Sequence, residues 1–278
     1  MRVLLTGSEG KIGRYVEVAL IDAGHRVTGF DLRSGQDVRD GAAVSRAAAA
    51  CDAIVHLAAI LPPGDSGNSS ELMGVNLLGT WNVLRAAREH EIGRIVFFSS
   101  VNALGIFMGN REPDYLPIDD FHPSYPRTPY SISKRLAEEM CRFHTEETGA
   151  VTVCLRPPLV VAPDEYQTTI ARWEQDPGSE WQPFWEYGAF LDVRDAASAA
   201  VAALTRPRSG HITTLLCADD IAATRPSRDL VDQLLRDIPW KDTDEYAMER
   251  YRALVSTARA KEVLRWQPRH RWRPLAAG

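Results

Sequence analysis

The sequence is poor in the residue patterns that build metal sites and disulfide frameworks. Its four cysteines form no C-x-x-C pair, and its seven histidines include no H-E-x-x-H pair. Both kinds of site need ligands at such close spacings. We therefore predict a protein without a metal, whose cysteines are free thiols in the reducing cytoplasm.

Long runs of basic or apolar residues are also missing. The net charge is −5 and no cluster of Lys and Arg occurs, which argues against a nucleic-acid surface. No apolar stretch is long enough to span a membrane. The first apolar run, Val3-Leu4-Leu5, is not preceded by the basic start of a secretory signal, so we expect no signal peptide. We expect a small-molecule substrate and no nucleic acid or membrane as partner.

Short β-branched or leucine-rich runs alternate with longer segments of helical period. Helices are predicted near 12–23, 72–90 and 130–147, and strands at 2–6, 27–31, 53–57, 94–99, 152–156 and 212–216. Such alternation builds a parallel sheet through right-handed crossovers. The prediction is an α/β fold, a Rossmann-type doubly wound parallel sheet with a small C-terminal substrate lobe.

The domain boundaries are predicted from where this alternation stops. Residues 1–161 are expected to form the dinucleotide-binding Rossmann domain, and 162–278 a mixed segment that gives the substrate lobe, with 190–218 returning to the sheet. The stretch 162–189 has no clean period and is predicted to be irregular. Its aromatic residues, candidates for stacking on a sugar or for packing in a lid, are Trp173, Trp181, Phe184, Trp185 and Tyr187.

Three glycines lie between the first predicted strand and the first predicted helix. Gly7 permits a tight turn, Gly10 lets the backbone approach a pyrophosphate, and Gly13 allows the helix to pack closely on the strand. The helix N-terminus offers unpaired N–H groups to the anion. The pattern indicates a dinucleotide-binding loop, with a merely structural turn as the alternative.

An acidic residue, Asp31, ends the second predicted strand about twenty residues after the loop. A carboxylate there accepts both hydroxyls of the adenosine ribose and repels a 2′-phosphate, so NAD is predicted and NADP is less favoured. Asp31 as an ordinary turn residue is the alternative. Asp37 and Val38 are candidates for contact with adenine, or form a simple loop.

Tyr130 and Lys134 lie four residues apart in a predicted helix, hence on one face. A free tyrosine has a pKa of about 10, and a neighbouring cation favours the phenolate. We predict that Lys134 and a positive nicotinamide ring lower the pKa of Tyr130, which then exchanges a proton with a substrate hydroxyl. The alternative is a solvated helix face.

Six further motifs follow in order along the chain. They are His56-Leu57-Ala58-Ala59, Asn76-Leu77-Leu78-Gly79-Thr80, Phe98-Ser99-Ser100, Arg156-Pro157-Pro158, Asp192-Val193-Arg194-Asp195 and Leu264-Arg265-Trp266-Gln267-Pro268. With these motifs the chain resembles the extended short-chain dehydrogenase/reductases, the NAD-dependent epimerase/dehydratase family.

The resemblance implies a set of cofactor contacts and a homodimer formed through helices 72–90 and 130–147. Besides the loop glycines, Asp31, Asp37, Val38, Tyr130 and Lys134, the implied contacts are Lys11, Ile12, Leu57, Ala58, Ala59, Asn76 and Pro157. For His56 and Asn76 a structural role in satisfying buried backbone groups remains open. Asp192 and Asp195 have helix capping as an alternative.

One position departs from the family pattern. A Ser or Thr usually follows the Ser-Ser pair to hydrogen-bond the substrate oxygen, but here the sequence is Ser99-Ser100-Val101-Asn102. Val101 has no polar group for this task. We predict Ser100 as the catalytic and substrate-binding hydroxyl, with Asn102 as substrate ligand or substitute.

The predicted function is an NAD-dependent oxidoreductase that takes hydride from a secondary alcohol of a sugar, sugar acid or similar small molecule. The short additions to the sheet favour a small substrate and resemble compact members such as the uronate dehydrogenases. The alternatives are a sugar or nucleotide-sugar epimerase with tightly bound NAD, and a non-catalytic dinucleotide sensor.

Overall fold

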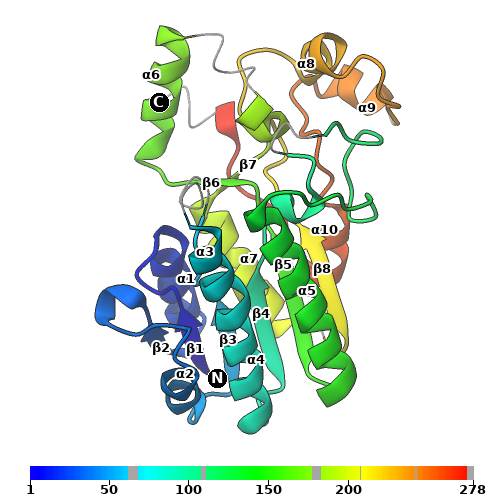
Figure 1. The fold of residues 1–278 in the computed structure, drawn as a ribbon. Coiled ribbons are helices and arrows are strands. Elements are labelled where there is room, and N and C mark those ends of the chain that lie inside the picture. The colour runs from blue at the N-terminus through cyan, green and yellow to red at the C-terminus, as the bar shows by residue number, and fades with distance from the viewer. Residues whose placement is uncertain (62–67, 108–110, 177–182, 207, 242, 274–278) are drawn as a thin grey trace.

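A six-stranded parallel sheet forms the centre of the protein (Figure 1). The structure is a computed structural model that describes residues 1–61, 68–107, 111–176, 183–206, 208–241 and 243–273. The strands are β1 (Arg2–Thr6), β2 (Arg26–Phe30), β3 (Ala53–His56), β4 (Arg94–Phe98), β5 (Val151–Arg156) and β8 (His211–Leu215), in the order β2-β1-β3-β4-β5-β8. Each predicted strand is confirmed to within one residue at either end.

Helices cover both faces of the sheet (Figure 1). On one face lie α1 (Lys11–Asp22), α7 (Val193–Thr205) and α10 (Ala258–Leu264), and on the other α2 (Gly41–Ala48), α4 (Gly79–Glu89) and α5 (Pro129–Thr148). Alternate strand residues enter opposite cores: Val3 and Leu5 join the first and Leu4 the second. Burial on both faces explains why the strands are apolar runs without polar alternation.

The predicted helix 72–90 is found as three consecutive segments. They are α3 (Ser69–Met73), a π-helical turn (Gly74–Leu78) and α4. The wider π turn changes the direction in which its side chains project. It carries Asn76, whose surroundings are described with the site.

A smaller lobe covers the carboxyl edge of the sheet. It contains the two-stranded parallel sheet of β6 (Leu159–Val161) and β7 (Phe190–Asp192), and the helices α6 (Glu165–Gln175), α8 (Ser227–Leu234) and α9 (Thr243–Met248). The prediction of irregular structure throughout 162–189 was wrong, because α6 lies within it. The apolar core of the lobe also takes residues from 101–118, including Leu104, Phe107 and Leu116.

The strand order reverses direction between β1 and β3. Ligands of doubly wound sheets bind at such a switch point, outside the carboxyl ends of the strands. Leu57 N–H joins the ends of β3 and β1 there by donating to the Thr6 carbonyl over 3.1 Å. Gly7 N–H joins the end of β1 to β2 by donating to the Phe30 carbonyl over 2.8 Å. In the part of the chain that the structure describes, no helix is both long and apolar enough for a membrane span.

A stripe of polar side chains on α5 is buried against the sheet. Tyr130, Lys134 and Glu138 follow one another at four-residue intervals and are 4%, 3% and 1% exposed. Glu138 accepts two hydrogen bonds of 2.7 Å from the Arg156 guanidinium at the end of β5. It also accepts one of 2.6 Å from the Ser99 hydroxyl after β4. These bonds fix α5 to the strands that carry the neighbouring site residues.

We expect Glu138→Gln to lower the free energy of unfolding by about 3–5 kcal/mol, because it removes the carboxylate that forms the buried ion pair with Arg156. Glu139→Gln is the matched control: Glu139 is half-buried and pairs with Arg135 and Arg142 at the surface, so its loss should cost under about 1 kcal/mol. Urea unfolding followed by circular dichroism measures both. Equal effects of the two substitutions would contradict the anchoring role of Glu138.

Candidate active site

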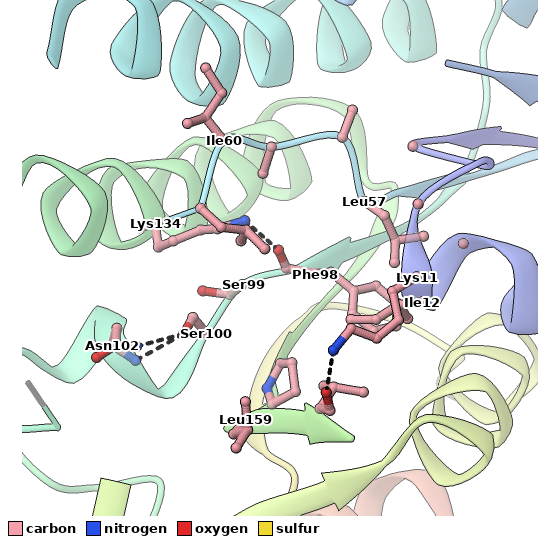
Figure 2. A pocket seen from close by; sticks show the side chains of 18 of the residues that line it. Lys11, Ile12, Leu57, Ile60, Phe98, Ser99, Ser100, Asn102, Lys134 and Leu159 are labelled. Atoms are coloured by element: carbon pink, nitrogen blue, oxygen red, sulfur yellow. Dashed lines mark hydrogen bonds between the residues drawn. The ribbon is translucent and has the colours of Figure 1, made fainter. Parts of the chain in front are cut away.

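A cavity of about 970 Å³ opens along the carboxyl edge of the sheet. Its wall is formed by the segments that follow β1, β2, β3 and β4, by the start of α5, and by β6, α6 and β7 of the lobe. Figure 2 shows Lys11 and Ile12 at one end and Ser100 and Asn102 at the other. The cavity therefore connects the glycine loop with the predicted catalytic residues.

Two of the three loop glycines, Gly7 and Gly13, are sites where a side chain would not fit. Gly7 has φ +72°, and a Cβ there would lie 2.7 Å from the Ala58 nitrogen. A Cβ on Gly13 would lie 2.1 Å from the Gly7 carbonyl oxygen. Gly10 precedes α1 without any side-chain cap, so the first N–H groups of that helix are available to an anion. The residues present thus fit the pyrophosphate of a dinucleotide.

The second strand brings Asp31 to the same end of the cavity. Its carboxylate accepts from the N–H groups of Glu9 and Arg33, both over 2.9 Å, and caps a short 3₁₀ turn. These bonds hold the carboxylate at the cavity wall. Asp37 and Val38 line the wall as well, so the turn role and the cofactor role are compatible.

Lys11 lines the cavity and links the loop to the lobe. Its ammonium donates to the Val160 carbonyl over 3.0 Å and to both carboxylate oxygens of Glu165 over 2.9 Å. Figure 2 shows the bond to the carbonyl. Its position beside Ile12 and Gly13 is that of the predicted cofactor contact, although its charge is paired with α6.

The segment after β3 supplies the adjoining wall with Leu57, Ala58 and Ala59. Asn76, predicted as a cofactor contact, does not line the cavity. Its amide binds both backbone groups of Ile60 over 2.8 and 3.1 Å and the Ser133 hydroxyl over 3.0 Å. The cofactor assignment of Asn76 is thereby corrected to the structural alternative.

His56 also has a structural environment. Its two ring nitrogens face the hydroxyls of Thr6 and Thr80 over 2.6 and 3.1 Å. Burial, and then the charge of Lys134, lower the pKa of His56 to about 3. The ring is therefore neutral at ordinary pH and supports the end of β3.

Tyr130, Ser100 and Lys134 come together at the inner end of the cavity. The Ser100 hydroxyl lies beside the phenol and favours its ionised form, and the Lys134 nitrogen lies 5.8 Å from the centre of the Tyr130 ring. Lys134 donates over 2.8 Å to the Phe98 carbonyl, as Figure 2 shows. Thr128 starts α5 as part of a capping box, which fixes the first turn that presents Tyr130.

The prediction that Lys134 lowers the pKa of Tyr130 is not met by the protein alone. Burial raises the pKa of Tyr130 well above its ordinary value, and the nearby Ser100 hydroxyl offsets this only in part. Burial also lowers the pKa of Lys134 to about 8. The phenol is a proton donor at neutral pH, and its ionisation requires a positive charge nearby.

The turn after β4 separates Val101 from its neighbours. Val101 is fully buried in the core of the lobe, whereas Ser100 and Asn102 both line the cavity. Asn102 contacts the Ser100 hydroxyl through its backbone N–H over 3.1 Å and through its amide nitrogen over 3.4 Å. The two residues that the sequence left as alternatives thus occupy the same wall.

Several lining residues carried no sequence signal. Glu186 is one of them, and its carboxylate accepts from the Asn102 amide over 3.0 Å. Phe107, Phe190 and Trp272 give the wall an apolar side.

Of the five predicted aromatic candidates, Tyr187 donates to the Ile106 carbonyl. The side chains of Trp173, Trp181, Phe184 and Trp185 lie outside the described residues.

The donor set of the site suits an alcohol or a carbonyl group. Phenol, serine hydroxyl and amide can hold one oxygen atom and move one proton. No group of three or more His, Cys, Asp or Glu side chains positioned for a metal occurs among the described residues.

The Asp192 carboxylate accepts from Arg194 N–H at the start of α7, which supports the capping interpretation of that motif.

Comparison with known sequences identifies a family with this arrangement. The sequence profile of the NAD-dependent epimerase/dehydratase family matches residues 3–216. The chain is 28% identical over 167 residues to a uronate dehydrogenase of Pseudomonas syringae, covering 56% of this chain and 58% of that protein. It is 30% identical over 172 residues to a UDP-glucose 4-epimerase of Halalkalibacterium halodurans, covering 56% and 50%. The chain thus spans about half the length of these curated relatives.

Solved structures match over nearly the whole chain. A short-chain dehydrogenase/reductase superfamily protein from Agrobacterium tumefaciens, crystallised with bound NAD, superposes with a TM-score of 0.75 and 25% identity. The superposition covers 100% of this chain and 95% of that one. The parallel sheet and the lobe therefore recur together in a related protein.

We expect Gly13→Ala to destabilise the protein by about 1–3 kcal/mol and to weaken the binding of a pyrophosphate-bearing dinucleotide at least tenfold. The added methyl group would meet the backbone oxygens of Gly7 and Ser8 at 2.1 and 2.8 Å. Gly93→Ala is the control, because nothing lies within 4 Å of a Cβ there. Thermal unfolding and calorimetric titration measure the two effects. A Gly13→Ala protein that binds as tightly as the Gly93→Ala protein would refute the role of the loop.

Proposed function

Because the chain belongs to the NAD-dependent epimerase/dehydratase family, we propose that it is an NAD-dependent oxidoreductase acting on a secondary alcohol of a sugar or similar small molecule. The observation that carries the proposal is the meeting of Tyr130, Ser100 and Lys134 in a cavity that begins at the glycine loop. The four cysteines are buried and unpaired, which suits work in the reducing cytoplasm.

The proposed roles follow from the arrangement of the site. Ser100 holds the substrate oxygen against the phenol, since its hydroxyl lies beside that group. Tyr130 takes the hydroxyl proton as the alcohol becomes a carbonyl, and returns it in the reverse reaction. Lys134 is held in place by the Phe98 carbonyl and favours the ionised phenol by its charge. The buried walls keep bulk water from the proton.

The cofactor would lie between the glycine loop and the catalytic residues. Gly7, Gly10 and Gly13 would hold its pyrophosphate, and Asp31 its adenosine ribose, which favours NAD over NADP. When bound, the oxidised nicotinamide ring supplies the hydride acceptor and a positive charge. Pro157 and the Leu57–Ala59 segment of the wall would flank that ring. The NAD in the related Agrobacterium tumefaciens structure supports this choice.

A sugar or nucleotide-sugar epimerase is the second candidate, favoured by the similarity to a UDP-glucose 4-epimerase. The same residues would serve both reactions, because an epimerase returns the hydride to the opposite face of the substrate carbon. Net formation of NADH during turnover separates the two: it accumulates with a dehydrogenase and does not with an epimerase. The non-catalytic sensor is not proposed, since the proton-transfer pair is complete.

The test is a screen of aldoses, uronic acids and nucleotide sugars with NAD or NADP, read by nicotinamide absorbance. We expect Tyr130→Phe to lower kcat by about 10²–10⁴-fold, the usual contribution of an acid–base group, while NAD binding changes less than threefold. Tyr15→Phe is the matched control, because Tyr15 packs in a core beside the sheet and does not line the cavity. Unchanged turnover of Tyr130→Phe would exclude the mechanism.

We further propose a homodimer that pairs α4 and α5 of one subunit with those of the other. The two helices contact each other and leave large apolar side chains exposed, among them Trp81 at 56% and Phe143 at 57%. A second copy would bury this surface. Light scattering should give twice the mass of 30.9 kDa, and Trp81→Glu with Phe143→Glu should give the single mass. A monomeric wild-type protein would contradict this.

A further inference from the structure

A run of left-handed backbone holds Glu186 against the cavity. Glu186 and Tyr187 have φ values of 50° and 56°, and Gly188 follows with 72°. The first two carry a Cβ, so their conformation costs free energy that other contacts offset. One such contact is the Tyr187 hydroxyl, which donates to the Ile106 carbonyl over 2.6 Å. Backbone strain at a cavity wall indicates that the side chain it orients, here Glu186, has a function in the cavity.

The Glu186 carboxylate connects two walls of the cavity. One oxygen accepts from the Asn102 amide over 3.0 Å, and the other accepts from the Leu159 N–H at the start of β6 over 2.6 Å. Asn102 contacts the Ser100 hydroxyl, which lies beside the phenol of Tyr130. Hydrogen bonds therefore run from Ser100, next to the proposed proton acceptor, through Asn102 to the Glu186 carboxylate.

Two acceptors of this wall have room for another donor. The carbonyl oxygen of Asn102 is buried and has no hydrogen-bond partner in the described part of the chain. The Glu186 carboxylate offers about four lone-pair positions, and Asn102 and Leu159 use two of them. A buried acceptor without a donor is costly. A ligand that carries hydroxyl groups would supply the missing donors.

The cations of the wall are engaged with other groups. Lys11 binds Glu165, Arg39 binds Asp37, and Lys134 donates to a backbone carbonyl of β4. No further Lys or Arg lines the cavity among the described residues.

The charge of Glu186 acts on the catalytic end of the cavity. It reaches Tyr130, where it opposes formation of the phenolate. Burial raises the pKa of Glu186 to about 7, with the bonds from Leu159 and Asn102 acting against this. When Glu186 is ionised, a carboxylate or phosphate on the substrate would meet a like charge beside the reacting alcohol, with no free cation in the described wall to offset it.

We propose that Glu186 and Asn102 form an acceptor pair that binds a hydroxyl group next to the reacting alcohol, so that the site selects uncharged polyhydroxylated substrates over the corresponding sugar acids. The inference rests on the proposed alcohol oxidation and narrows its substrate class. Glu186 is a positioning and selectivity residue, and the proton is still transferred by Tyr130.

Galactose and galacturonate are a matched pair of probes, because they differ only in a hydroxymethyl or carboxylate group at C6. With the NAD-loaded wild-type protein we expect kcat/KM to favour galactose at least tenfold. Glu186→Gln should reduce that ratio at least fivefold, mainly by raising KM for galactose and lowering it for galacturonate, with kcat changed less than threefold. Glu186→Asp keeps the charge and should retain the preference.

Glu112→Gln is the control, because Glu112 is exposed and lies outside the cavity lining; it should leave the ratio unchanged. Unfolding curves of all variants reveal any loss of structure. A wild-type preference for galacturonate would overturn the inference. So would a Glu186→Gln protein that is folded and keeps the wild-type ratio.

Sugar binding to the NAD-loaded protein, measured by saturation-transfer NMR, separates this inference from the proposed function. If no sugar is oxidised but galactose binds better than galacturonate, and Glu186→Gln removes the difference, the oxidation is refuted and the acceptor pair stands. If both sugars are oxidised with equal kcat/KM, the oxidation stands and the acceptor pair is refuted. Failure of both sugars to bind also refutes the acceptor pair.

Discussion

The attachment of α5 to the ends of β4 and β5 is the constraint on which the site depends. Lys134 binds the last carbonyl of β4, and Glu138 binds Arg156, the last residue of β5. Both charges are buried, so neither can leave its partner without a large loss of free energy. Ser100 is the second residue after β4, and Pro157 is the first after β5. One face of α5 therefore fixes the position of Tyr130 relative to Ser100 and Pro157.

Much of this arrangement was predictable because it depends on local sequence. The apolar runs gave the strands to within one residue. The glycine pattern marked the loop, because a side chain does not fit at Gly7 or Gly13. The spacing of Tyr130 and Lys134 gave their common helix face. The distance from the loop to Asp31 gave the acid at the same end of the cavity.

The remaining features depend on contacts between distant segments, which no local pattern encodes. Asn76 carries an amide that could bind a cofactor, but this amide forms hydrogen bonds with Ile60 and Ser133 instead. The high pKa of Tyr130 follows from burial by the lobe, which the Y-x-x-x-K spacing cannot reveal. Glu186 is placed at the wall by the left-handed φ angles of Glu186 and Tyr187. Both residues lie in a stretch of sequence that has no hydrophobic period.

The cavity wall is drawn from two stretches of the chain. Residues near the cofactor end come mostly from the first sixty positions, whereas Asn102 and Glu186 come from a later turn and the lobe. Both lie in short turns, and connecting segments tolerate replacement better than strands do. Mutation of these two turns can therefore give new selectivity while the glycine loop and the proton-transfer pair are inherited unchanged.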